Sequence, residues 1–108
     1  MRKFHMTIGG RQVRLEANWN ALIGFLQETG KDDLGALADL KTLRPSDLAG
    51  LMAACINEGE RLEGRESSYT ARTLGEVINA SDVLEFVNLY SSMVSPDVPE
   101  EEEGKKKD

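Results

Sequence analysis

The stretch FHMTIGGRQVRLEANWNALIGFLQETG, from Phe4 to Gly30, decides the fold because its hydrophobic period changes from about two residues to about 3.6. Apolar residues alternate with polar ones on both sides of Gly9 and Gly10, which predicts a β-hairpin with a two-residue turn. The apolar spacing that follows Asn18 predicts an amphipathic helix. The sequence therefore indicates a hairpin that leads directly into a helix.

The turn sets the register of the two strands, because a two-residue loop leaves one pairing that gathers the apolar side chains on one face. The pairs on that face are Phe4 with Leu15, Met6 with Val13, and Ile8 with Arg11. The polar pairs on the other face are Lys3 with Glu16, His5 with Arg14, and Thr7 with Gln12. We expect this second face to be solvent-exposed.

The helix after the hairpin is expected from Trp19 to Thr29, with Asn18 as its N-cap and Gly30 as its stop. Its apolar stripe is Trp19, Leu22, Ile23 and Leu26. A short helix is expected next, capped by Asp32 or Asp33. That helix carries Leu34, Leu37 and Leu40.

A longer helix is expected after Arg44, with Pro45 at its first position and Gly64 at its end. Its stripe is Leu48, Leu51, Met52, Cys55, Ile56 and Leu62. Gly59 falls on this stripe and is expected to allow a close helix crossing. The nearby arginines and glutamates are expected to form a solvated, mixed-charge surface. They are Arg61, Arg65 and Arg72 with Glu58, Glu60, Glu63 and Glu66.

Two more helices are expected in the last third of the chain. Thr70 is the expected N-cap of a short helix that carries Leu74, Val77 and Ile78. Ser81 or Asp82 is the expected cap of the final helix. The apolar surface of that helix is wide, so it either lies centrally in the core or awaits a partner in part. Its members are Val83, Phe86, Val87, Leu89, Tyr90, Met93 and Val94.

These elements predict an α+β fold that is mostly α, with the N-terminal hairpin packed on a compact bundle of four to five helices. Residues 1–96 are expected to form a single domain, as a length of 108 residues suggests. Residues 97–108 hold six acids, three lysines and one hydrophobic residue, Val98. Such a segment buries too little apolar surface to order itself, so we expect a disordered acidic and basic tail.

The charge balance disfavours nucleic acid as a partner. The chain carries 13 basic and 19 acidic side chains, a net charge of -6, and no basic stripe. Nucleic-acid affinity comes largely from phosphate neutralisation by lysine and arginine. No apolar run is long enough for a membrane span or a signal peptide, so a cytoplasmic location is expected.

Catalytic and metal chemistry have little to use in this sequence. The single histidine, His5, is expected on the exposed face of the hairpin, and the single cysteine, Cys55, within the apolar run LMAACI. Catalysis at neutral pH usually enlists a positioned histidine, cysteine or carboxylate pair. We therefore expect no enzyme, no metal site and no cofactor.

Three segments carry a resemblance to a known family: MTIGGRQVRLEANWNALIGFLQETG, DLAGLMAACINEGE and TLGEVINASDVLEFVNLYSSM. In their order and apolar spacing they resemble the tail assembly chaperones of long-tailed bacteriophages and the related gene transfer agent proteins. The resemblance implies a non-enzymatic protein of the bacterial host cytoplasm. It also implies that the protein binds the tape-measure protein and helps to recruit tail-tube subunits.

A chaperone of this kind needs an apolar groove for amphipathic helical segments. The residues expected to supply surface left over after the core is filled are Phe25, Phe86, Leu89 and Met93. The alternative is a small DNA-binding or regulatory domain in which the Leu48–Leu62 region forms part of a helix-turn-helix. The sequence does not determine the oligomeric state, and a homo-oligomer is one possibility.

Overall fold

The hairpin forms as the alternation predicts. The structure is a computed structural model that describes residues 3–31, 35, 40 and 43–94. Strand β1 spans Phe4–Ile8 and strand β2 spans Arg11–Leu15. They pair antiparallel from Phe4 opposite Leu15 to Ile8 opposite Arg11, which confirms the expected register. Gly9 and Gly10 have φ of 58° and 82°, the positive values that a type I′ turn requires at both central residues.

Helix α1 spans Trp19–Thr29, and both expected ends are confirmed. The Asn18 side chain accepts a hydrogen bond from the Ala21 backbone N–H, and Gly30 follows with φ of 75°. The expected apolar stripe is wrong in part, because Ala21 and Phe25 are the side chains of α1 that are buried. Trp19 is instead 64% exposed. The helix carries apolar residues around most of its circumference, so its period alone did not determine which side faces the core.

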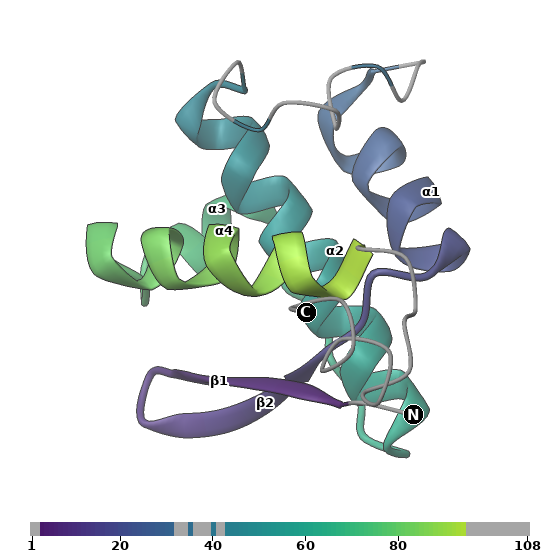
Figure 1. Ribbon diagram of the computed structural model, residues 1–108, viewed down its shortest axis with the longest axis vertical. Helices are drawn as coiled ribbons and strands as arrows, with labels where there is room; N and C mark the ends of the chain where they lie inside the picture. Colours follow the sequence, from purple (N-terminus) through teal and green to yellow (C-terminus); the bar gives the residue numbers. More distant parts are fainter. Residues whose placement is uncertain (1–2, 32–34, 36–39, 41–42, 95–108) are drawn as a thin grey trace, which may run out of the picture.

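Helix α2 spans Pro45–Leu62 and lies at the centre of the molecule (Figure 1). It contacts α1, α3, β2 and α4, and every residue from Gly50 to Ile56 is buried. Small residues on several of its faces, among them Gly50, Ala53 and Ala54, let these neighbours approach closely. Pro45 occupies the first turn as expected. Leu62, expected on the apolar stripe, is 43% exposed near the end of the helix.

Helix α3 is shorter than expected and spans Ala71–Gly75. The Thr70 cap is confirmed, with a capping box formed by Thr70 and Thr73. Helix α4 spans Ala80–Val94. The sequence placed its cap at Ser81 or Asp82, but the Asn79 side chain accepts from the Asp82 N–H at 3.1 Å. Asp82 returns the bond to the Asn79 N–H at 3.0 Å, so the start of α4 lies slightly earlier than expected.

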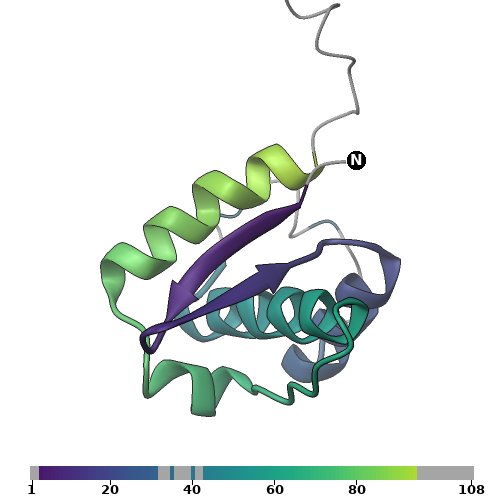
Figure 2. The ribbon, with the colours of Figure 1, turned by 90° about the horizontal axis from the view of Figure 1, so that it is seen from below.

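The hairpin covers one side of a helical layer. Seen from below, β2 lies in front of α2, and α4 runs beside β1 (Figure 2). Helix α1 packs on another side of α2. The core fills the space between these elements, and its largest members are Ile8, Leu15, Phe25, Leu51, Met52, Ile56, Leu74 and Phe86. The expected α+β fold, mostly helical with an N-terminal hairpin, is therefore confirmed.

Two expectations concern residues that the structure does not describe. The short helix around Asp32 to Leu40 lies largely outside the described residues. The same holds for the end of the domain at residue 96 and for the charged tail at 97–108. Both stay predictions from the sequence.

Candidate functional site

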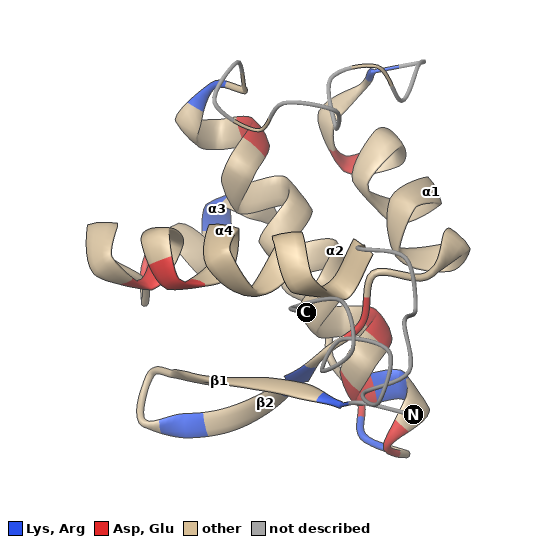
Figure 3. Cartoon of the chain, viewed as in Figure 1, with Lys and Arg blue, Asp and Glu red and all other residues tan. Residues whose placement is uncertain are grey.

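Acidic and basic residues of the hairpin and of α2 gather near the C-terminal end of α2 (Figure 3). The sequence predicted a solvated, mixed-charge surface for the glutamates of α2, and for two of them this prediction is wrong. Glu60 is fully buried and Glu58 is 7% exposed. A buried carboxylate needs charged and hydrogen-bonded partners, so each of these two residues draws several neighbouring groups into contact with it.

The Glu60 carboxylate joins α2 to the hairpin and to the segment that follows α2. Arg65 donates to both of its oxygens at 2.8 Å, and the Arg14 backbone N–H donates at 2.9 Å. Arg11 adds a longer contact of 3.3 Å. The bonds from Arg65 lower the pKa of Glu60 from 4.5 to about 2, although burial acts in the opposite direction. Glu60 therefore stays ionised and holds three segments of the chain together.

The backbone after α2 turns Arg65 toward Glu60. The Gly64 N–H donates to the Arg61 carbonyl, and the Arg65 N–H donates to the Glu60 carbonyl at 2.9 Å. This is the bond pattern of a Schellman motif, with Gly64 at φ of 81°. Glu60 thus binds Arg65 through both its backbone and its side chain.

Gly59 lets α2 approach the outer edge of β2. A Cβ atom at Gly59 would lie 2.2 Å from the Arg14 carbonyl oxygen, so a side chain at this position would collide with the strand backbone. The sequence predicted a close crossing between helices at Gly59, but the close partner is β2. The Glu16 N–H also donates to the Cys55 carbonyl at 3.0 Å. Helix α2 therefore caps the outer edge of β2.

Arg14 was expected on the exposed face of the hairpin with His5, and this expectation is wrong. Arg14 is 6% exposed, and its guanidinium contacts Glu63 at 2.8 Å and Glu16 at 3.0 Å. Its Nε atom is buried and has no hydrogen-bond partner among the residues that the structure describes. The end of α2 covers this part of the polar face, whereas His5 is exposed.

Glu58 forms a second polar cluster, between α2 and the start of α1. Arg61 donates to both of its oxygens, at 3.0 and 2.7 Å, and Asn18 donates at 2.8 Å. Arg61 lowers the pKa of Glu58 to about 2, again against the effect of burial. The N-cap residue of α1 is thereby fixed to α2.

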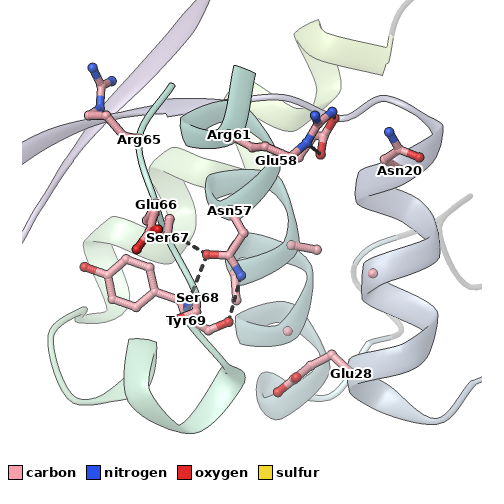
Figure 4. Close-up of a pocket in the computed structure, with 14 residues that line it drawn as sticks. Asn20, Glu28, Asn57, Glu58, Arg61, Arg65, Glu66, Ser67, Ser68 and Tyr69 are labelled. Carbon is pink, nitrogen blue, oxygen red and sulfur yellow. Dashed lines mark hydrogen bonds and ion pairs between the residues drawn. The ribbon is translucent and has the colours of Figure 1, made fainter. Parts of the chain in front are cut away.

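A groove of about 710 Å³ lies over α2, between α1 and the extended segment 66–69 (Figure 4). We call it the α2 groove. Small residues form its floor, namely Gly24, Gly50, Ala53 and Ala54. The close-up shows the Glu58–Arg61 pair at one end of the groove and Glu28 at the other. The floor is apolar and the rim is polar.

Asn57 holds the segment that forms one wall of the α2 groove. Its amide nitrogen donates to the Tyr69 carbonyl at 2.8 Å, and its oxygen accepts from the Tyr69 N–H at 2.9 Å and the Ser67 hydroxyl at 2.7 Å. Glu28 of α1 accepts from the Ala71 N–H at 2.7 Å, which ties α1 to the start of α3. These bonds give the groove walls fixed positions.

Exposed apolar side chains lie next to the α2 groove on α1. Trp19 is 64% exposed and Ile23 is 39% exposed. The two lie one helical turn apart, on the face adjacent to that of Asn20 and Gly24, which line the groove. The sequence expected core packing for Trp19, so it missed this surface.

The four residues predicted to bind a partner do not form one surface. Phe25 and Phe86 are fully buried, so the expectation that they remain on the surface is wrong. Phe86 instead packs against Tyr90, with ring centroids 5.8 Å apart. Leu89 and Met93 are partly buried against the core, and their role in partner binding stays a prediction.

One signal in the sequence could have identified the buried carboxylate. Glu60 follows Met52 and Ile56 at intervals of four residues, so it lies on the apolar stripe of α2. An acid on such a stripe is buried with a partner or lies beyond the core. No comparable local signal marks Trp19 as exposed.

Cys55 is fully buried as expected, and burial raises the pKa of its thiol. No group of three or more His, Cys, Asp or Glu side chains in the described ranges is arranged to hold a metal ion. Within the same ranges, no helix has both the length and the hydropathy needed to cross a membrane.

Comparisons with known proteins add no relative. No protein-family model matches the chain, and neither the curated proteins nor the solved structures include a significant match.

Proposed function

We propose that the chain is a non-enzymatic tail assembly chaperone that binds the tape-measure protein and assists tail-tube assembly. The resemblance of its three sequence segments to that family supports the partner and the biological role. The observation that carries the binding role is the pair of exposed apolar residues, Trp19 and Ile23, beside the α2 groove.

A partner helix fits this surface chemically. An amphipathic helix presents apolar residues on one face, which would cover Trp19 and Ile23, and polar residues beside them, which would meet the groove rim. Tryptophan is enriched among residues that dominate binding energy. Covering the exposed part of Trp19 removes on the order of 100 Å² of apolar surface, worth roughly 3 kcal/mol.

The surface on α4 is the second candidate for the same partner. Leu89 and Met93 already pack in part against the core, so less of their area remains for a partner. Trp19 offers more exposed apolar area and lies beside a groove. We therefore place the main contact on α1.

The burial and the contacts of α2 argue against the helix-turn-helix alternative, in which this helix was expected to take part. A recognition helix enters the major groove of DNA with an exposed face. Helix α2 is buried from Gly50 to Ile56, and Arg61 in its last turn binds Glu58. Arg65, which follows the helix, binds Glu60. These contacts favour a structural role for α2.

The test measures binding of the 108-residue chain to overlapping fragments of a bacteriophage tape-measure protein. Trp19 is the only tryptophan, so its fluorescence reports directly on the proposed surface. We expect the emission to shift to shorter wavelength as a binding fragment is added. Trp19→Ala should weaken binding by about thirtyfold, or about 2 kcal/mol, in isothermal titration calorimetry.

Leu84→Ala is the matched control, because Leu84 is 66% exposed on α4, away from the α2 groove. This variant should bind with unchanged affinity. Met93→Asp tests the α4 surface in the same assay. Equal affinities for Trp19→Ala and the parent chain would reject the α1 surface, and failure of every tape-measure fragment to bind would reject the assigned partner.

A further inference from the structure

Residues 66–69 form the wall of the α2 groove that lies opposite α1, and we call this segment the strap. The chain is fixed on both sides of the strap. Before it, Arg65 binds Glu60 through both its backbone and its side chain. After it, the Ala71 N–H donates to Glu28 at 2.7 Å. The strap runs between these two fixed points and is neither helix nor strand.

One side chain, that of Asn57, supplies every hydrogen bond between the strap and the rest of the described chain. Asn57 donates to the Tyr69 carbonyl and accepts from the Tyr69 N–H and the Ser67 hydroxyl. The backbone groups of residues 66–68 form no hydrogen bond with any residue that the structure describes. The hydrogen bonds that fix the strap therefore all depend on a single residue of α2.

Open space lies on both sides of the strap. The α2 groove is on one side, and a hollow of about 370 Å³ lies between the strap, Arg11 of β2 and Thr73 of α3. Figure 4 shows the Tyr69 ring on the side of the strap that faces away from α1. Glu66 and Ser68 are exposed, and Tyr69 is only partly buried against the core. Little core packing therefore resists a movement of the strap toward the hollow.

We propose that the strap is a movable wall, that Asn57 holds it in place, and that its release widens the α2 groove for the partner helix. The role in partner binding rests on the proposed function. A helix that covers Trp19 and Ile23 extends its flanking side chains over the groove floor toward the strap. Release of the strap gives these side chains room. Asn57 is thus a positioning residue, whose bonds lower the apparent affinity by keeping most molecules closed.

The first experiment measures amide hydrogen exchange of the 108-residue chain by NMR, without a partner. Opening of the strap breaks about three hydrogen bonds, so exchange of the Tyr69 amide should be slowed on the order of a hundredfold relative to an unstructured amide. The amide of Ile56, which is buried in α2, should be slowed at least about a thousandfold, because it exchanges through global unfolding. Low concentrations of urea should speed exchange at Ile56 and leave Tyr69 unchanged, since local opening exposes little surface.

The second experiment measures binding of the tape-measure fragments to Asn57→Ala, with Trp19 fluorescence for the rates and calorimetry for the affinity. This variant removes all three bonds to the strap. We expect the fragment to bind at least about tenfold more tightly than to the parent, mainly through faster association, because the closed state no longer competes. If Asn57 only shaped a rigid wall, the same variant would bind more weakly.

Two further variants control this comparison. Asn57→Asp keeps the acceptor for Tyr69 and Ser67 and loses the donor, so its affinity should lie between those of the parent and Asn57→Ala. Asn88→Ala removes an exposed asparagine of α4 and should bind as the parent does. Circular dichroism checks that each variant is folded before its affinity is compared.

A Tyr69 amide that exchanges as slowly as Ile56, with the same dependence on urea, overturns the movable strap. Unchanged or weaker binding by folded Asn57→Ala overturns its role in partner binding. If no tape-measure fragment binds any variant, the proposed function is rejected, and the exchange of Tyr69 still decides whether the strap opens. The two failures are therefore distinguishable.

Discussion

Glu60→Gln removes the charge at the centre of the contact between α2, the hairpin and the segment after α2. The amide oxygen of glutamine can still accept from the Arg14 N–H. Its amide nitrogen, however, faces the Arg65 guanidinium. Both groups are hydrogen-bond donors, so no hydrogen bond forms between them. The variant therefore keeps the shape of the side chain and loses its main ion pair.

The pKa of Glu60 sets the size of the expected loss. A pKa lowered from 4.5 to about 2 corresponds to roughly 3 kcal/mol of stability at neutral pH. Arg11 and Arg65 have side chains 53% and 48% exposed, so water screens their contribution. We therefore expect Glu60→Gln to lower the free energy of unfolding by about 2 kcal/mol. The corresponding drop in melting temperature is roughly 8–16 °C for a domain of this size.

The same ion pair makes stability depend on pH. Because the folded-state pKa of Glu60 lies below its usual value of 4.5, its contribution is complete above about pH 5. The contribution is lost as the pH falls toward 2. Glu58 behaves alike, since its pKa is also lowered to about 2. The parent chain should therefore lose stability between pH 5 and pH 2 more steeply than Glu60→Gln.

Urea unfolding followed by circular dichroism measures both effects. Glu85→Gln on α4 is the matched control, because Glu85 is exposed and forms no ion pair with the residues that the structure describes. It should unfold within about 0.5 kcal/mol of the parent. If Glu60→Gln and Glu85→Gln were equally stable and had parallel pH profiles, the reasoning about the buried carboxylate would be refuted.

Two further predictions test the packing around α2. Gly59→Ala should destabilise the fold by about 3 kcal/mol in urea unfolding, because the new Cβ collides with the Arg14 carbonyl. Gly75→Ala, which meets no atom within 4 Å, should be neutral or slightly stabilising, and equal losses for both variants would contradict the close approach. Cys55 should not react with a thiol reagent at pH 8 until the chain unfolds, since burial raises the pKa of its thiol, and rapid labelling of the folded chain would contradict its burial.

Local features of the fold could be predicted from the sequence alone. The hairpin register follows from the Gly9-Gly10 turn and the alternation around it, which involve residues close in the chain. The Asn18 and Thr70 caps follow from side chains that bond backbone groups a few residues away. The cap of α4 was misplaced, because several residues there could have filled the same position.

The candidate site could not be predicted in the same way. The apolar character of α1 extends around most of the helix, so only its packing against α2 determined that Phe25 faces inward and Trp19 outward. Phe86 was expected at the surface because α4 carries more apolar residues than one face needs. The additional apolar residues of α4, Phe86 among them, are buried where α4 packs against the hairpin and α2.

The sequence by itself therefore determined the pairing of the hairpin, the positions of α1 and α2 and the caps at Asn18 and Thr70, because short-range turn, cap and periodicity preferences set them. Only the tertiary structure decided which partners the buried charges meet and which apolar groups stay exposed. Glu60 is buried because residues 46 and 49 positions away in the chain, Arg14 and Arg11, meet it there. Such pairings arise from the packing of whole elements, and the spacing of residues along the chain does not record them.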